Sequence, residues 1–295
     1  MSDRPLAERW LADLRRLGKS DKTISGYRRA LTHLARWTET TYGTPFDSAA
    51  VIPRDIADWK AFQQTVENAK PATINQRLAG VSRFFKWAQA HEHIRTDPTA
   101  GVKRERPAPR RPRALTDRDR KKLTRAVAQT GNLRDVALVE LLLGTGLRVS
   151  EALALRRGDV TLGARSGEVR VRRGKGGMSR TVPLTATVRR ALRDYLELYP
   201  DLGGEDPLWV GERGALKSPS GVFRLLKKYA RFAGVDETAV SPHVLRHTFA
   251  TRYLAANPND LRGLAALLGH AGLDTVMIYT EPSTDDLARR MELVA

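Results

Sequence analysis

The 295-residue sequence contains no cysteine, which excludes disulfide bonds, thiolate nucleophiles and cysteine-ligated zinc. It also has no run of about eighteen apolar residues, the length that a membrane-spanning helix needs. The N-terminal segment MSDRPLAERW includes acidic side chains and lacks an apolar core, so a secretory signal is not expected. These absences predict a protein of the cytoplasm.

Acidic residues are scarce relative to basic ones. The chain has 51 Lys and Arg against 33 Asp and Glu, which gives a formal net charge of +18 at pH 7. Such an excess favours a polyanionic partner. Nucleic acid is the first expectation, and an acidic membrane surface is the alternative.

The first hundred residues have the pattern of a helical bundle. Apolar residues recur at helical spacing in four runs, and Pro71 is a suitable first-turn residue for the fourth. The apolar positions of the four runs are Leu6, Trp10, Leu14 and Leu17; Ile24, Tyr27, Leu31, Leu34 and Trp37; Ile56, Trp59, Phe62 and Val66; and Ile74, Leu78, Val81 and Phe85. We therefore predict an N-terminal helical domain over residues 1–102.

A basic, proline-rich segment, KRERPAPRRPR, follows at residues 103–113. Its three prolines disfavour regular structure, and six basic residues accompany a single acidic one. We predict an extended linker over residues 103–114 that lies along a phosphate backbone, with a merely solvated linker as the alternative. The residues expected to contact DNA are Lys103, Arg104, Arg106, Arg110, Arg111 and Arg113.

Residues 115–295 form the second predicted domain. Helical spacing runs from a capped start at Thr116 to the turn Gly144-Thr145-Gly146. The period then changes to alternation in three short segments, 160–162, 168–172 and 180–184, and Gly174-Lys175-Gly176-Gly177 forms a turn between the last two. From residue 187 onward the pattern is helical again. The predicted fold class is mainly α with one small antiparallel sheet.

Two candidate cations lie in glycine-rich surroundings. Arg148 follows the turn in GTGLRVSE, and Glu151, three residues later, can hold its guanidinium through a charged hydrogen bond. Lys175 lies at the tip of the glycine-rich hairpin. Taken singly, each is more typical of an ordinary surface residue, although glycines at the tip would also let the hairpin approach a DNA groove.

The C-terminal part of the chain gathers histidines, an arginine and a tyrosine. His243 and Arg246 share one face of a helix that begins after Ser241-Pro242, near the positive helix end that favours a phosphate. His247 points elsewhere and is expected to support or pack. His270 and Tyr279 follow in LLGHAGLDTVMIYT. Arginine grips phosphate oxygens, imidazole moves protons and tyrosine accepts a phosphate covalently, so this group predicts attack on a phosphodiester.

No nucleotide, metal or other cofactor is expected. Gly176 directly follows Lys175, so the spacing of a phosphate-binding loop is missing. Among the histidines at 243, 247 and 270 there is no HExxH spacing, and Arg246 would place a cation in any zinc site there.

The order of these motifs resembles the tyrosine recombinases, the integrase-type family that includes the bacterial Xer proteins and the phage integrases. The resemblance covers nearly the whole chain, and the size is closer to Xer-like enzymes than to the larger phage integrases. It implies an N-terminal core-binding domain of the SAM-like helical type and a C-terminal α+β catalytic domain, which together form a C-shaped clamp on DNA. The strings that carry it are GTGLRVSEALAL, RGKGGMSRTVPL, SPHVLRHTFAT and LLGHAGLDTVMIYT.

The resemblance also implies residue roles. Tyr279 would be the nucleophile that forms a 3′-phosphotyrosyl link, Glu151 would support Arg148, and His247 would lie behind the site. The implied catalytic set is Arg148, Lys175, His243, Arg246, His270 and Tyr279.

An assembly is implied as well. Four subunits would act on two DNA sites through a Holliday junction, associated with the nucleoid, with the C-terminal helix exchanged in trans. The reaction would serve dimer resolution or the integration and excision of a mobile element. The alternatives are a type IB topoisomerase-like nicking and relaxing enzyme and a non-catalytic architectural DNA-binding protein.

Overall fold

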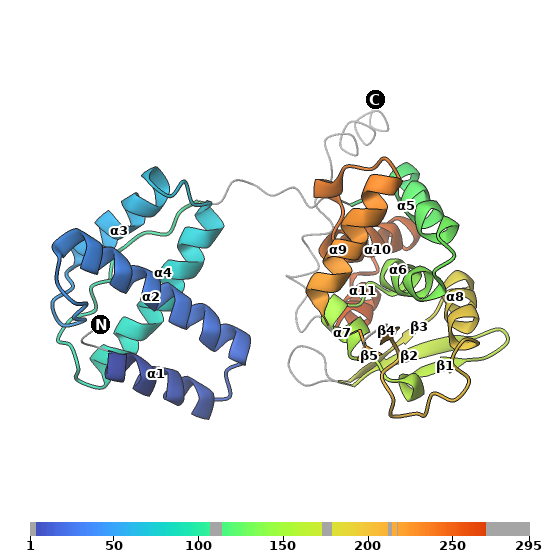
Figure 1. Ribbon diagram of the computed structural model, residues 1–295, viewed down its shortest axis with the longest axis horizontal. Coiled ribbons are helices and arrows are strands. Elements are labelled where there is room, and N and C mark those ends of the chain that lie inside the picture. The colour runs from blue at the N-terminus through green and yellow to red at the C-terminus, as the bar shows by residue number, and fades with distance from the viewer. Residues whose placement is uncertain (1–3, 107–113, 173–178, 212–213, 217, 270–295) are drawn as a thin grey trace. The chain divides into compact units, whose positions relative to one another are not determined.

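The computed structural model describes residues 4–106, 114–172, 179–211, 214–216 and 218–269. The chain divides into two compact units, Met1–Arg110 and Arg111–Ala295 (Figure 1). Each unit has its own hydrophobic core. Within the described ranges, no helix combines the length and the apolar content that crossing a membrane requires.

The N-terminal unit is a bundle of four helices, which confirms the helices predicted from apolar spacing. They are α1 Arg4–Arg16, α2 Asp21–Tyr42, α3 Pro53–Thr65 and α4 Pro71–Ala90. Ser20 caps α2 by accepting a hydrogen bond from the Thr23 amide, and Gly43 ends the helix in the left-handed conformation, with φ of 68°. Helices α2 and α4 pack side by side, and Trp10, Trp59 and Phe84 are almost completely buried. Burial of these aromatic side chains stabilises the bundle.

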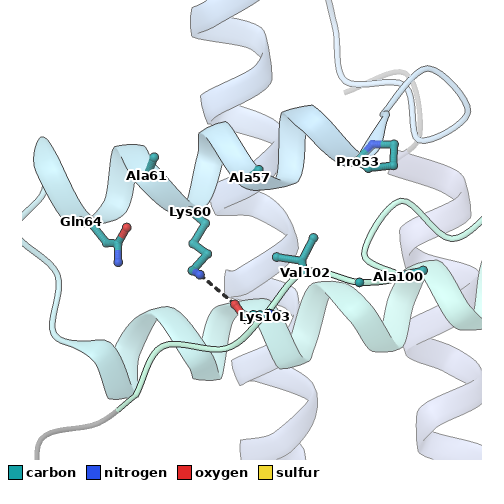
Figure 2. Close-up of a pocket in the computed structure, with 9 residues that line it drawn as sticks. Pro53, Ala57, Lys60, Ala61, Gln64, Ala100, Val102 and Lys103 are labelled. Carbon is teal, nitrogen blue, oxygen red and sulfur yellow. Dashed lines mark hydrogen bonds between the residues drawn. The ribbon is translucent and has the colours of Figure 1, made fainter.

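The first residues of the predicted linker are bonded to this bundle. Asn75 of α4 accepts a hydrogen bond from the Glu105 amide and donates one to the Glu105 carbonyl oxygen, both at 2.8 Å. The ammonium group of Lys60 on α3 donates to the carbonyl oxygen of Lys103 at 2.7 Å, as Figure 2 shows, and lies 2.6 Å from Glu105 Oε1. Residues 103–106 thus have no helix or strand, as expected, yet are fixed to α3 and α4.

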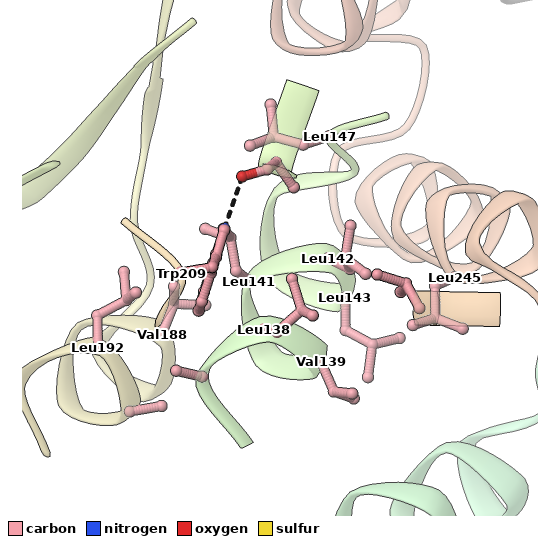
Figure 3. Packing of buried hydrophobic residues seen from close by; sticks show 14 of the residues in the cluster. Leu138, Val139, Leu141, Leu142, Leu143, Leu147, Val188, Leu192, Trp209 and Leu245 are labelled. Atoms are coloured by element: carbon pink, nitrogen blue, oxygen red, sulfur yellow. Dashed lines mark hydrogen bonds between the residues drawn. The ribbon is translucent and has the colours of Figure 1, made fainter. Parts of the chain in front are cut away.

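The C-terminal unit is mainly helical. Its helices are α5 Asp117–Gln129, α6 Leu133–Thr145, α7 Val149–Leu153, α8 Ala186–Leu196, α9 Pro219–Phe232, α10 Pro242–Ala256 and α11 Leu261–Leu268, with short 3-10 turns at Arg157–Asp159 and Glu237–Ala239. Helix α6 is buried on most sides, and Leu138 and Leu142 pack in a core that also contains Leu192, Trp209 and Leu245 (Figure 3). A helix enclosed in this way is a rigid support for the residues at its end.

Three short strands form an antiparallel sheet in the order β1-β2-β3, near the predicted positions. They are β1 Val160–Leu162, β2 Gly167–Val171 and β3 Arg180–Pro183. Val169 pairs with both Val160 and Val182, and Val171 pairs with Arg180. Strand β3 also contacts α11, so the sheet reaches the last described helix.

The helical pattern predicted from residue 187 onward is wrong in one region. A second sheet of two strands, β4 Val210–Gly211 and β5 Gly214–Ala215, lies between α8 and α9. Strands of two residues are too short to show alternation in a sequence, which explains why they were not expected.

Candidate active site

The turn between α6 and α7 brings three helices together. Gly146 ends α6 with φ of 63°, a left-handed conformation that glycine adopts without strain. A Cβ atom on Gly146 would lie 2.4 Å from Cδ1 of Phe249 and 2.8 Å from Cδ2 of Leu268. The missing side chain therefore lets the end of α6 lie directly against α10 and α11.

Arg148 follows this turn as the residue that precedes α7. Its Nη1 atom donates to Glu151 Oε1 at 2.8 Å, and its backbone amide donates to Glu151 Oε2 at 2.9 Å. The contact predicted between these two residues is confirmed. Because the carboxylate holds both the backbone and the side chain of Arg148, it fixes the direction in which the guanidinium leaves the helix.

Arg246 reaches the same place from α10. Its side chain is buried, with Nη1 donating to the Gly146 carbonyl oxygen at 2.7 Å and Nη2 donating to the Leu268 carbonyl oxygen at 2.9 Å. Nη1 of Arg148 also donates to the Leu268 oxygen, at 3.4 Å. The two arginines, far apart in sequence, thus meet at the last carbonyl of α11, where the negative end of the helix favours cations.

A third arginine, Arg180, joins this group, although the sequence pattern did not predict it. Its Nη2 atom lies 2.7 Å from Glu151 Oε2, its Nη1 atom 3.2 Å from Glu151 Oε1, and its Nε donates to the Leu267 carbonyl oxygen at 2.8 Å. The only signal in the sequence is a positive charge where a strand begins, after the glycine-rich segment. Nothing in the sequence identifies its distant partners.

The site carries an excess of positive charge. Burial raises the pKa of Glu151, but hydrogen bonds from Arg180 and Arg148 outweigh it and leave the pKa below its ordinary value. The carboxylate is therefore ionised at neutral pH. Three guanidinium groups against this one carboxylate leave two positive charges, which suit an anion such as a phosphate.

The histidines of α10 lie beside Arg246. Ser241 caps this helix by accepting a hydrogen bond from the Val244 amide at 3.2 Å, and Pro242 occupies its first turn. His243 is exposed in the same first turn, where an anion is favoured, while His247 is partly buried.

The structure describes only some of the predicted DNA-binding and catalytic residues. Lys103, Arg104 and Arg106 are exposed on the N-terminal unit. In the ranges that the structure describes, no group of three acidic or histidine side chains has the arrangement of a metal site. The residues for which the structure gives no placement are Lys175, His270, Tyr279, Arg110, Arg111 and Arg113.

Comparison with known proteins gives one consistent result. The sequence profile of the phage integrase family matches residues 113–285. Tyrosine recombinase XerD of Ralstonia nicotianae is 37% identical over 284 residues, which cover 94% of this chain and 88% of the relative. Tyrosine recombinase XerC of Agrobacterium fabrum is 35% identical over 300 residues, which cover 96% of this chain and 90% of the relative.

A solved structure shows the same fold. The XerH site-specific recombinase bound to difH substrate matches with a TM-score of 0.71 at 21% identity, covering 92% of this chain and 79% of that one. The family match spans more than half of the chain, and both sequence relatives match almost all of it. The chain therefore belongs to the phage integrase family of tyrosine recombinases, within which it is an Xer-like site-specific recombinase.

Proposed function

We propose that this recombinase opens and reseals double-stranded DNA through Tyr279. The phenol oxygen attacks the scissile phosphorus, the bond to the 5′-oxygen breaks, and a 3′-phosphotyrosyl link and a 5′-hydroxyl result. The observation that carries this proposal is the meeting of Arg148 and Arg246 at the Leu268 carbonyl oxygen. In the sequence, Leu268 precedes His270 by two residues and Tyr279 by eleven.

The two arginines would hold the non-bridging oxygens of the phosphate. Within the described ranges, Nη2 and Nε of Arg148 donate to no protein acceptor, so their N–H groups can donate to the substrate. The negative charge on these oxygens is shared with fixed cations in a partly buried site, which stabilises the transition state strongly.

The other members of the proposed catalytic set would transfer protons or donate hydrogen bonds. Lys175 would protonate the departing 5′-oxygen, His243 would assist removal of the phenol proton, and His270 would donate a hydrogen bond to the phosphate. An unassisted phenol has a pKa of about 10, so the nucleophile needs this cationic neighbourhood to react at neutral pH.

The chemistry needs no nucleotide. The phosphotyrosyl ester retains the energy of the broken phosphodiester, so a second 5′-hydroxyl can displace the tyrosine without ATP. The arginines and Lys175 supply the positive charge that metal-dependent enzymes obtain from divalent ions.

The partner is double-stranded DNA that contains a specific site, in line with the XerH structure bound to difH substrate. Exchange of strands between two sites calls for four active sites, so we place a tetramer on two DNA sites, with a Holliday junction as intermediate. The C-terminal segment, residues 283–295, would dock on the neighbouring subunit in trans. The enzyme would work at the nucleoid, in dimer resolution or in movement of a genetic element.

The residue ranges of this proposal are those expected from the sequence. Residues 1–102 would bind the core of the DNA site, residues 103–114 would link the domains along the phosphate backbone, and residues 115–295 would carry catalysis. Tethering of residues 103–106 to α3 and α4 supports a DNA-contacting role for Lys103 and Arg104, because it holds their exposed side chains on a fixed surface.

Replacing Lys103, Arg104 and Arg106 together with glutamine should weaken DNA binding uniformly across sequences. The slope of log K against log salt should also fall by about 0.9 for each phosphate that the variant no longer neutralises. The measurement is DNA affinity over a series of salt concentrations, with Lys19, an exposed lysine just before α2, changed to glutamine as the control. An unchanged slope in the triple variant would show that these residues do not face DNA.

Covalent capture tests the proposed reaction. A duplex with a nick beside the scissile phosphate loses its short 5′-hydroxyl fragment after cleavage, so resealing is prevented and the protein stays attached. We expect this adduct on a denaturing gel with the wild-type protein and none with Tyr279→Phe, which removes only the hydroxyl. Recombinant product from two sites identifies a recombinase, whereas relaxation of DNA without such sites identifies a topoisomerase. DNA binding without an adduct would indicate an architectural protein.

A further inference from the structure

Glu151 is shared between two arginines that belong to different elements. Arg148 precedes α7, and Arg180 is the first residue of β3. The carboxylate is buried, and each of its oxygens bonds both residues: Oε1 meets Nη1 of Arg148 and Nη1 of Arg180, while Oε2 meets the Arg148 amide and Nη2 of Arg180. A carboxylate held on both oxygens from two sides has one orientation available.

Arg148 and Arg180 differ in the hydrogen-bond partners of their guanidinium nitrogens. All three guanidinium nitrogens of Arg180 bond the protein, through Glu151 and the Leu267 carbonyl oxygen. Within the described ranges, only Nη1 of Arg148 has protein acceptors, so its Nη2 and Nε are left for a substrate. Arg148 is thus arranged to bind an anion, whereas Arg180 holds the Glu151 carboxylate and the end of α11 in place.

Arg180 also holds the end of α11. The Leu267 carbonyl oxygen that it binds is one residue before the Leu268 oxygen at which Arg148 and Arg246 meet. A cation at the negative end of a helix stabilises that end, and here the same cation bonds the carboxylate that orients Arg148. One side chain therefore connects β3, α7 and α11 at the point where the phosphate would lie.

Charge balance gives Arg180 a second effect. With Arg148 alone, the carboxylate of Glu151 would neutralise the cation that is meant to bind the phosphate. A second arginine on the same carboxylate offsets this, so that Arg148 keeps more of its attraction for a substrate anion.

We propose that Arg180 is a positioning residue for strand cleavage, which orients Arg148 through Glu151 and fixes the end of α11. This inference rests on the proposed function, because it assumes that Arg148 binds the scissile phosphate. The experiment measures DNA affinity and the single-turnover rate of adduct formation for Arg180→Gln, Arg180→Lys and a matched control.

The matched control is Arg172→Gln. Arg172 comes directly after β2, and its Nε lies 2.5 Å from the buried carboxylate of Asp159. It therefore anchors the other strand of the same strand pair to a buried acid, without contacting Glu151 or α11. Any general loosening of the sheet should appear in both variants.

Arg180→Gln should slow adduct formation by about 10–100-fold, the range expected when a reacting group loses its alignment. DNA affinity should stay near that of the wild type, and Arg172→Gln should cleave at nearly the wild-type rate. Arg180→Lys should recover part of the rate, because lysine restores the charge but cannot bond Glu151 and Leu267 together. Should Arg180→Gln fail to fold, the lysine variant carries the test, with an intermediate loss of rate expected.

A double-mutant cycle shows whether Arg180 acts through Glu151. In a Glu151→Gln background the further change Arg180→Gln should cost less rate than it does in the wild type, because the charged bridge between the two residues is already broken and only the bond to the Leu267 carbonyl oxygen is left to lose. Full additivity, equal losses of affinity and rate, or a wild-type rate in both Arg180 variants would overturn the inference. Absence of an adduct with the wild-type protein is a different result, which refutes the proposed function itself.

Discussion

Arg246→Ala is expected to slow formation of the phosphotyrosyl adduct by about 10²–10³-fold, the loss typical when one donor to a developing oxyanion is removed. DNA affinity should change much less, because binding depends on many phosphate contacts along the site. The reason is geometric: Arg246 is buried, and its guanidinium is fixed by the carbonyl oxygens of Gly146 and Leu268 at the place where Arg148 also points.

The measurement compares single-turnover cleavage and affinity for Arg246→Ala and Arg252→Ala. Arg252 lies on the same helix, but its side chain is 52% exposed and its ion pair with Asp117 is long, at 3.6 Å. The control should cleave like the wild type. Equal losses of affinity and cleavage in Arg246→Ala would contradict a role in the transition state.

A chemically altered substrate sharpens this test. Replacing one non-bridging oxygen of the scissile phosphate with a methyl group removes the charge that Arg246 would neutralise. Arg246→Ala should therefore recover a large part of the wild-type rate on this substrate. A variant as slow on the neutral phosphate as on the charged one would show that Arg246 does not serve the phosphate.

Gly146→Ala should have the largest effect on stability. A side chain in the left-handed conformation costs about 1–2 kcal/mol, and forcing a methyl group into a filled space costs about 1–3 kcal/mol more. The new Cβ would collide with Phe249 and Leu268, so α10 and α11 must move away from α6. Cleavage should fall together with stability, because these helices carry Arg246 and the carbonyl oxygen that it shares with Arg148.

Gly131→Ala is the matched control. Gly131 has φ of 68°, close to that of Gly146, but a Cβ atom there would meet nothing within 4 Å. Denaturant unfolding of both variants separates the free-energy cost of the left-handed conformation from that of the steric clash. Gly131→Ala should lose only the stability that the left-handed conformation costs, and it should retain cleavage. Equal losses of stability in the two variants would mean that the close approach at Gly146 does not matter.

Much of the fold followed from local sequence patterns. The spacing of Trp10 and Leu14, and of Ile74 and Leu78, predicted helices because one face of each must be buried, and the structure confirms them. The alternation around Val169 predicted a strand for the same reason. Strands β4 and β5 were missed because two residues carry no periodicity, and their pairing depends on the chain around them.

In the site, too, contacts between residues close in sequence were predictable and contacts between distant residues were not. The pairing of Arg148 with Glu151 was predictable because the residues are three apart on one helix start. Arg180 was not, since its partners Glu151 and Leu267 lie 29 and 87 residues away. The anchoring of Glu105 on Asn75, 30 residues away, was hidden for the same reason. Contacts of this kind are set by packing of whole elements, which no local pattern records.

In the proposed reaction, Tyr279 attacks the phosphate that Arg148 and Arg246 hold. Mass spectrometry of the trypsin-digested adduct identifies the attacking residue, because the tryptic peptide of residues 263–289 contains a single tyrosine. We expect a nucleotide remnant on Tyr279 in this peptide. A remnant on any other residue, or no remnant on a protein that binds its site, would contradict it.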